Sequence, residues 1–220
     1  MDWHQQFDGY CERTDLTLWS EPLNAITNIA FLIAAFVIWR RIRGQGMVWA
    51  NVLVWIMVAI GVGSGLFHTF ATAWASLADV APIGIYILVY LYAVNSDVLD
   101  MPWWLAAIGV ALFAPYAALL TPVFNGLPFF HISNFYWVVP LLILAYTPFV
   151  ARKRRETALG MSLGAAILAV SISIRSLDEI LCAINPFGTH FLWHILNAVM
   201  LGWMIEVYRR HMLGKTRVDS

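Results

Sequence analysis

Long apolar stretches, separated by short polar ones, dominate the hydropathy pattern of this chain. Seven of them are long enough to cross a membrane as helices, since a helical span needs about 20 apolar residues. Only short connections separate them, so the pattern predicts one domain over residues 1–220 without an internal repeat. The predicted spans are Pro22–Trp39, Met47–Phe70, Leu77–Val94, Met101–Leu120, Asn134–Val150, Thr157–Ala183 and His190–Val207.

Polar residues precede, follow and interrupt these runs. The first twenty residues are polar and acidic and do not resemble a cleavable signal peptide, so residues 1–21 are expected to form an extramembrane N-terminal segment. Residues 121–128 are rich in Pro, Gly and Asn and predict a loop. Residues 208–220 are expected to form a cytoplasmic tail. The predicted fold class is an all-α bundle of seven transmembrane helices.

The composition agrees with an integral membrane protein. Of the 220 residues, 61% are hydrophobic and 12% are charged, and the mean hydropathy is +0.73. Soluble domains carry roughly 25% charged and about 45–50% apolar residues. The formal net charge is zero, so nothing suggests nucleic acid as a partner, whereas the lipid bilayer is an expected one.

Basic residues gather after the first, fifth and seventh spans. The ends of odd-numbered spans lie on one side, and an excess of Lys and Arg marks the cytoplasmic side. Of the thirteen basic residues, only Arg13 and Arg175 fall on the other side. We therefore expect the N-terminus outside and the C-terminus in the cytoplasm. The short loops favour a bacterial inner membrane, with the polar site toward the periplasm.

Ionisable residues inside or beside apolar spans are costly and usually mark function. Here they come from five separate regions of sequence, yet all fall at the predicted outer boundary of the membrane. They are Glu21, His68, Asp79, Asp178, Glu179, His190 and His194. This clustering predicts one polar site at that boundary.

Three of these residues are histidines and suggest a metal. His190 and His194 are four residues apart, so on a helix they share one face. His68 supplies a third imidazole from another span. A catalytic zinc site typically has three protein ligands and one open position for water, whose pKa the zinc lowers toward ~7. The alternative is that each histidine is a hydrogen-bonded packing residue. His4, His131 and His211 lie outside the predicted spans and are interpreted as ordinary interfacial residues.

Ser64 and Asp79 are the candidate catalytic residues beside these histidines. Ser64 precedes His68 by four residues, so its hydroxyl can stabilise an oxyanion or a zinc-bound water, or instead bond back to its own helix. Asp79 can carry a proton to a leaving amine, or instead be a helix N-cap or orient a histidine. Asp178-Glu179 is open to the same interpretations, with Arg175 as an expected salt-bridge partner.

Together these residues resemble the alkaline ceramidase family, part of a wider superfamily of seven-span membrane hydrolases. The resemblance extends from the N-terminus to the last span. The matching blocks are Tyr10-Cys11-Glu12-Arg13 with Trp19-Ser20-Glu21-Pro22-Leu23-Asn24-Ala25-Ile26-Thr27-Asn28, then Gly63-Ser64-x-x-x-His68 with Asp79, and His190-x-x-x-His194.

The resemblance implies a zinc ion held by His68, His190 and His194. It also implies that Ser64 stabilises the oxyanion or the water and that Asp79 shuttles the proton. The expected reaction is hydrolysis of the amide of a ceramide-like lipid to a sphingoid base and a fatty acid.

Members of that family also carry a calcium site in the acidic N-terminal segment, and hard oxygen ligands suit calcium. The pattern departs from the family's at Gly9, where an acidic residue is expected, and at Thr14, where an amide is expected and Asp15 is a substitute. The alternative is a solvated acidic N-terminus with Glu21 capping the first span. The nearest candidate calcium ligands are Asp8, Tyr10 through its carbonyl, Glu12, Thr14 and Glu21.

The two cysteines, Cys11 and Cys182, both fall on the predicted outer side, where oxidation is permitted. Relatives pair cysteines at similar places, so the resemblance predicts a Cys11–Cys182 disulfide. The alternative is two free, partly buried thiols.

Two alternative functions stay open at this point. One keeps the chemistry but acts on an acyl ester or another lipid amide. The other is a seven-span receptor or transporter whose histidines bind metal or shuttle protons. The chain has no pair of Gly/Pro-broken half-helices typical of transporter sites and no central lysine in the last span for a retinal Schiff base.

Overall fold

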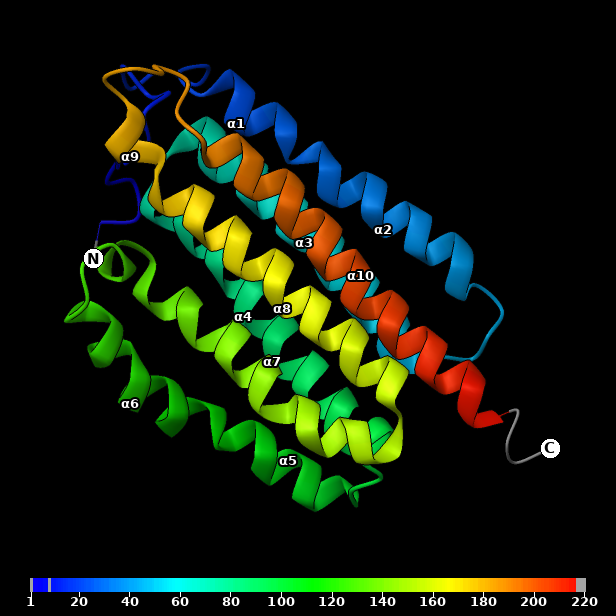
Figure 1. Cartoon of the computed structure of the whole chain (residues 1–220). Helices are drawn as coiled ribbons and strands as arrows, with labels where there is room; N and C mark the ends of the chain where they lie inside the picture. Colours follow the sequence, from blue (N-terminus) through cyan, green and yellow to red (C-terminus); the bar gives the residue numbers. More distant parts are fainter. Residues whose placement is uncertain (1, 8, 217–220) are drawn as a thin grey trace.

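The computed structural model describes residues 2–7 and 9–216 and is built from helices (Figure 1). Among these residues the only strand-like pairing is one isolated bridge between Gln6 and Thr72. The elements in chain order are α1 (Pro22–Thr27), α2 (Ile29–Ile42), α3 (Val48–Phe70), α4 (Ala73–Ala93), the π-helix η1 (Val94–Val98), α5 (Trp103–Ala111), α6 (Phe113–Asn125), the 3-10 helix η2 (Phe130–Ser133), α7 (Asn134–Lys153), α8 (Arg155–Ser176), α9 (Asp178–Leu181) and α10 (His190–Thr216).

Within residues 2–7 and 9–216, seven helical stretches are long and apolar enough to cross a membrane. The chain is therefore a multi-pass integral membrane protein, and the predicted fold class is confirmed. The first stretch combines α1 and α2, which are separated only at Asn28. The third, fourth and fifth combine α4 with η1, α5 with α6, and η2 with α7. The remaining three are α3, α8 and α10.

Two helix ends in the second half differ from the sequence prediction. α6 continues to Asn125, so most of the segment expected as a loop at residues 121–128 is helical. The sixth span ends at Ser176, and Asp178 starts the separate short helix α9. The Asp178 carboxylate accepts hydrogen bonds from the backbone N–H groups of Thr189 and His190, at the start of α10.

The last helix is longer than its apolar run. α10 continues to Thr216, through most of the segment expected as a tail. Glu206 pairs with residues three and four positions later, Arg209 and Arg210, and such pairs support additional helical turns. His211 is consequently buried inside the bundle and is not interfacial as expected.

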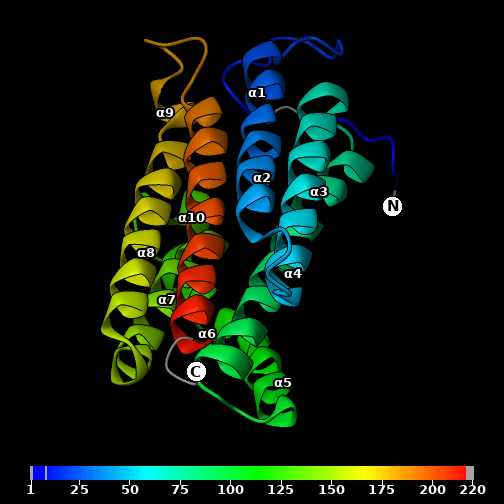
Figure 2. The same cartoon turned by 90° about the vertical axis from the view of Figure 1, so that its right-hand side faces the viewer.

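α10 is the most enclosed of the seven spans and packs against α8, α2, α3 and α1 (Figure 2). α3 pairs with α4 and α7 pairs with α8, while α5 and α6 lie at the edge of the bundle against α4 and α7. Large apolar side chains cover the outer faces, including Trp55, Trp103 and Leu119, as expected for surfaces that contact lipid. The residues of the predicted polar site lie on α3, α4, α9 and α10, or directly before α1.

Gly63 allows α3 and α4 to approach closely just below the predicted site. A Cβ atom at this position would lie 2.0 Å from the Ala78 carbonyl oxygen. Pro82 lies four residues after Ala78 in α4 and has no N–H to offer that carbonyl. The absence of a side chain at Gly63 therefore brings Asp79 of α4 next to Ser64 of α3.

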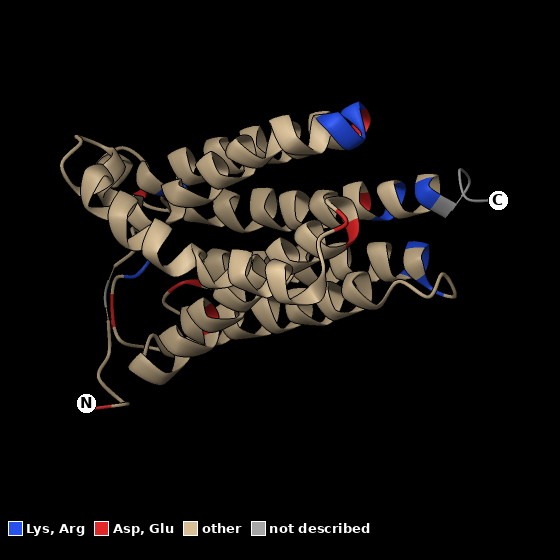
Figure 3. Ribbon diagram, turned by 90° about the horizontal axis from the view of Figure 1, so that it is seen from below, with Lys and Arg blue, Asp and Glu red and all other residues tan. Residues whose placement is uncertain are grey.

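The two ends of the bundle carry different residues. Lys and Arg gather at the end where the C-terminus lies (Figure 3), here called the basic end, with Arg40, Arg41, Arg43, Arg152, Lys153, Arg154, Arg155, Arg209, Arg210 and Lys215. The opposite end, here called the histidine end, contains residues 9–21, the last turn of α3, α9 and the first turns of α10. Which end faces the cytoplasm stays a prediction.

Candidate metal centre

Three fully buried histidines meet at the histidine end. His68 lies in the last turn of α3, and His190 and His194 lie in the first two turns of α10. Each offers one ring nitrogen within 4.8 Å of the other two. Nε2 of His68 and Nε2 of His194 are 3.1 Å apart. The i, i+4 spacing on α10 has therefore produced the shared face that the sequence predicted, and α3 completes the cluster.

The hydrogen bonds behind two of the rings direct their unprotonated nitrogens toward the centre. Nδ1 of His68 lies 2.6 Å from Oε2 of Glu21, a carboxylate oxygen that accepts a hydrogen bond from the ring N–H. Nδ1 of His194 lies 3.0 Å from the Thr27 hydroxyl, which itself donates to the Leu23 carbonyl and so accepts from the ring. In each case Nδ1 carries the hydrogen and Nε2 keeps its lone pair.

This protonation pattern fits a cation at the centre. Two unprotonated nitrogens facing each other at 3.1 Å repel unless a positive charge lies between them. Nδ1 of His190 is buried and finds no hydrogen-bond partner among the described residues. Imidazoles held from behind by a carboxylate or hydroxyl are typical of metal ligands. The cluster therefore suggests a metal site.

Asp178 fixes the start of the helix that carries two of these ligands. Its Oδ1 accepts hydrogen bonds from the backbone N–H groups of Thr189 (2.6 Å) and His190 (2.8 Å), and its Oδ2 accepts one from Cys11 (3.0 Å). A carboxylate at a helix N-terminus satisfies free N–H groups and interacts favourably with the helix dipole. Asp178 is thus occupied by backbone groups, and no ion pair with Arg175 occurs among the described residues, contrary to expectation.

A disulfide joins Cys11 to Cys182 and confirms the predicted pairing. Gly188, at φ +62°, lies against the same junction, where a Cβ atom would be 2.1 Å from Oδ1 of Asp178. The N-terminal segment is therefore covalently tied to the loop that positions α10.

Ser64 and Asp79 lie on adjacent helices beside His194, and all three line one cavity of ≈ 40 Å³. Ser64 is buried one turn before His68, and Asp79 is half-buried and interacts with the Ser64 side chain and with His68. α4 begins at Ala73, so Asp79 is not its N-cap. The remaining roles, in proton transfer or in orienting a histidine, stay open.

Two further side chains beside the site, Tyr10 and Arg175, were not predicted from the sequence to contribute to it. The Tyr10 ring lies over His190, with ring centroids 3.9 Å apart, and burial raises the pKa of its phenol, which keeps it a neutral donor. Arg175 donates to the Ser133 hydroxyl (2.8 Å), lies over the Tyr136 ring and interacts with both Tyr10 and Asp79. The available signal was that Arg175 is an arginine inside an apolar run, on the side where Arg13 is the other basic residue.

The N-terminal oxygen groups do not support the expected calcium site. Both carboxylate oxygens of Glu12 accept backbone N–H groups at the start of α1, from Leu23 (2.6 Å) and Asn24 (2.8 Å). Glu12 rather than Glu21 therefore caps the first span, and both carboxylates are buried instead of solvated. Among the calcium candidates, the carbonyl of Tyr10 accepts the N–H of Arg13, and Glu21 contacts Arg13 and His68. Thr14 donates its backbone N–H to the Ser20 hydroxyl, and Asp8 lies outside the described residues.

Glu21 is ionised in this setting. Burial alone raises the pKa of a carboxyl group, but hydrogen bonds from His68, Arg13 and Asn24 outweigh it and hold the pKa of Glu21 below its ordinary value.

A family model described as Ceramidase matches residues 9–217, which is nearly the whole chain. No curated protein matches the chain.

Proposed function

The chain belongs to the ceramidase family, and on this premise we propose that it is a zinc-dependent intramembrane hydrolase with the metal held by His68, His190 and His194. Membership in this family implies amidohydrolase activity on ceramide-like lipids, with a sphingoid base and a fatty acid as products. The observation that carries the proposal is the buried cluster of three imidazoles with Ser64 and Asp79 in the adjoining cavity.

A zinc ion bound by three imidazoles lowers the pKa of a coordinated water toward neutrality and polarises a carbonyl group. Zinc rather than another metal is part of the proposal, supported by the all-nitrogen ligand set.

Asp79 is proposed to move the proton. As water attacks the amide carbon, the Asp79 carboxylate takes a proton from it and then delivers that proton to the departing amine nitrogen as the C–N bond breaks. Asp79 is half-buried and adjoins His68, which suits a group that must face both water and substrate.

Ser64 is proposed to stabilise charge rather than to carry the proton. Its hydroxyl is buried one turn before His68 and can donate a hydrogen bond to the amide oxygen as negative charge develops there. The neutral phenol of Tyr10 and the guanidinium of Arg175 provide further donors at the same end.

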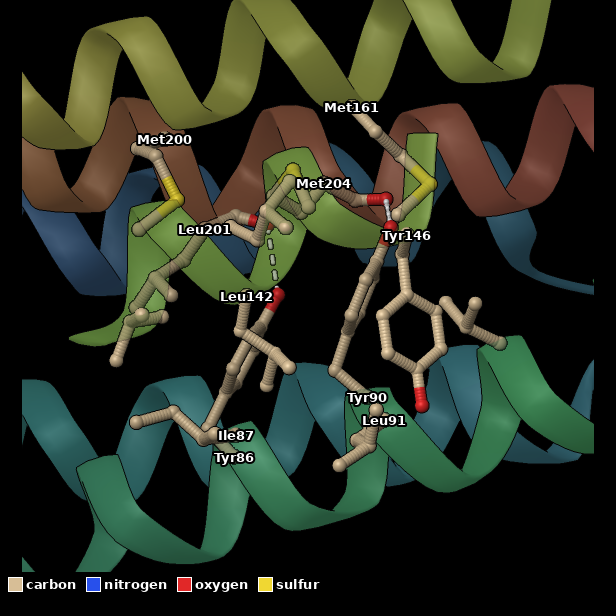
Figure 4. Close-up of a pocket in the computed structure, with 13 residues that line it drawn as sticks. Tyr86, Ile87, Tyr90, Leu91, Leu142, Tyr146, Met161, Met200, Leu201 and Met204 are labelled. Atoms are coloured by element: carbon tan, nitrogen blue, oxygen red, sulfur yellow. Dashed lines mark hydrogen bonds between the residues drawn. The ribbon is translucent and has the colours of Figure 1, made fainter. Parts of the chain in front are cut away.

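An apolar cavity next to the catalytic one suits a hydrocarbon chain (Figure 4). The two cavities share Tyr86, Ile87, Val139, Met200 and Leu201. The second, of ≈ 70 Å³, extends between α4, α7, α8 and α10 to Met161. Two of the lining tyrosines use their hydroxyl groups in hydrogen bonds to backbone carbonyls (Figure 4). Tyr86 donates to the Leu201 carbonyl (2.8 Å) and Tyr90 to the Met204 carbonyl (3.3 Å). The lining is therefore apolar, as a lipid tail requires.

The finer location is also a proposal. By the positive-inside rule, we propose that the basic end faces the cytoplasm. The short connections support the further proposal of a bacterial inner membrane, with the histidine end at its outer, periplasmic boundary. We also propose that residues 1–220 form a single membrane domain.

One assay tests both metal and substrate. The purified protein should contain zinc and hydrolyse labelled ceramide, and a chelator should abolish the activity. Matched ester lipids and other acyl amides in the same assay test the alternative substrates. Bound zinc without any hydrolysis would overturn the enzymatic proposal and favour a binding protein.

Two variants assign the side chains. Asp79→Asn should lower kcat by about 10²–10⁴-fold with zinc content unchanged, because the residue moves a proton and does not hold the metal. Ser64→Ala should lower kcat by about 10²–10³-fold, again with zinc retained. Zinc loss in either folded variant would mean that the residue supports the metal site instead.

A further inference from the structure

Arg13 lies in the N-terminal segment, yet its side chain is 1% exposed and surrounded by oxygen atoms. Its Nε donates to Oε1 of Glu21 (2.5 Å). Its Nη1 donates to the carbonyls of Asp15 (3.1 Å) and Thr17 (3.4 Å), and its Nη2 donates to the carbonyl of His68 (3.2 Å). One carboxylate and three backbone carbonyls thus converge on one positive charge.

The carboxylate in this group is shared with the metal centre. Glu21 uses Oε1 for Arg13 and Oε2 for Nδ1 of His68 (2.6 Å). Arg13 also reaches the backbone of the same histidine through its carbonyl. The three side chains therefore form a continuous buried chain of hydrogen bonds that ends on a metal ligand.

A set of carboxylate and carbonyl oxygens is the kind of environment that a calcium ion uses. Here a guanidinium fills it, and a second cation in the same space would repel Arg13 at short range. A buried carboxylate without a compensating charge would otherwise be strongly unfavourable.

From this arrangement we infer that Arg13 is a positioning residue that takes the place of a divalent cation: its guanidinium neutralises Glu21, holds it on His68 and makes the metal centre independent of calcium. The inference rests on the proposed metal function of the three histidines. Lysine is a poorer choice here, because a single ammonium cannot reach carbonyls on opposite sides while pairing with a carboxylate, whereas a planar guanidinium can.

The wild-type protein gives the first test. Prepared in calcium-free buffer, it should contain stoichiometric zinc and no stoichiometric calcium, and added calcium should change neither its thermal stability nor its activity. Stoichiometric calcium, or activity that disappears in calcium-free buffer and returns with calcium, would overturn the inference. The metal content decides this even for a protein that hydrolyses no lipid, so failure of the proposed function is distinguishable.

Zinc affinity, measured by competition with a zinc-binding dye, gives the second test. Arg13→Met should weaken zinc binding by about 10–100-fold, the usual effect of losing support behind a ligand. In a Glu21→Gln background the same change should have little further effect, because Arg13 acts through Glu21. Unchanged zinc affinity in folded Arg13→Met would contradict the inference. So would an equally large loss of zinc affinity when Arg13→Met is added to Glu21→Gln.

Two further variants keep this test interpretable. Arg209→Met removes an arginine from Glu206, the buried glutamate at the basic end, and should leave zinc affinity unchanged. Arg13→Lys keeps the charge and covers the case in which Arg13→Met does not fold. It should bind zinc more weakly than the wild type and more tightly than Arg13→Met, and wild-type affinity would show that the guanidinium contacts are unnecessary.

Discussion

Each end of the bundle buries one glutamate against arginine, and the two glutamates differ in what else they contact. At the histidine end, Glu21 is 2% exposed, Arg13 is 1% exposed and His68 is 0% exposed, so the whole group is removed from solvent. At the basic end the Glu206 side chain is 4% exposed, but its partners reach solvent, with exposed fractions of 18% for Arg209, 60% for Arg210 and 52% for Arg41.

The difference separates a site from a structural ion pair. Charges that stay partly hydrated, like the arginines around Glu206, lose little solvation and add modestly to stability. In a fully buried pair both charges lose their solvation. Apolar residues of similar shape in the same place often give the protein equal or greater stability. Stability alone therefore does not explain why Glu21 and Arg13 are buried together. The contact by which Glu21 orients His68 does.

The largest effect is expected for a metal ligand. His194→Ala should lose bound zinc and all measurable hydrolysis, because two imidazoles no longer enclose the ion. The matched control is His211→Ala at the basic end, since His211 is also a buried histidine of α10 whose Nδ1 lies 3.0 Å from a hydroxyl, that of Thr157. It should keep its zinc. Stoichiometric zinc in folded His194→Ala would count against the ligand assignment.

The two glutamates themselves come next. Glu21→Gln should weaken zinc binding by about 10–100-fold and lower stability by about 3–5 kcal/mol, since Arg13 is left buried without its partner. Glu206→Gln should lower stability by about 1 kcal/mol, because its arginines can turn to water. Zinc titration and thermal unfolding of both variants measure the contrast. Equal zinc affinities would remove the distinction drawn between the two ends.

Removing the disulfide should have a smaller effect, on stability rather than on metal binding. The Cys11→Ser/Cys182→Ser double variant should lose about 2–4 kcal/mol, since a bond between residues 171 positions apart restricts the unfolded chain. Asp178 still holds the backbone of Cys11, Thr189 and His190 in this variant. Zinc affinity should therefore change less than in Glu21→Gln, and a larger change would mean that the disulfide itself positions the ligands.

The smallest effect is expected at the basic end, at Asp100. Hydrogen bonds from Lys153 and Lys215 hold the pKa of Asp100 below its ordinary value. A lowered carboxyl pKa stabilises the fold fully above the unfolded value of about 4, and this contribution disappears as the pH falls through the lower folded value. Asp100 is 45% exposed, so Asp100→Asn should lower stability at neutral pH by at most about 1 kcal/mol.

The pH profile makes that prediction specific. Thermal unfolding of the wild type and Asp100→Asn should converge as the pH drops below about 4, where the wild-type carboxylate is also protonated. A difference that persists unchanged in acid would assign the effect to packing and not to charge. Zinc affinity should be the same in both proteins.

Much of the architecture was already decided by the sequence alone. Seven apolar runs predict seven spans because a bilayer sets the length of a helix that crosses it, and the seven stretches are present. The shared face of His190 and His194 follows from the pitch of one helix. These features depend on neighbouring residues only, and chain connectivity fixes them. The helix ends at Asn125, Ser176 and Thr216 did not follow from the apolar content. At the end of α10, the ion pairs of Glu206 support turns beyond the apolar run.

The tertiary structure alone decided which buried polar groups meet. Glu21 and His68 are 47 residues apart, and Arg13 contacts both. Sequence reasoning placed Glu21 in a calcium site or at a helix cap, because an acidic segment is compatible with either. Which partner a buried carboxylate finds depends on how helices from distant parts of the chain pack. In the absence of water each charge takes the nearest group that compensates it, and that neighbour exists only once α1, α3 and α10 have come together.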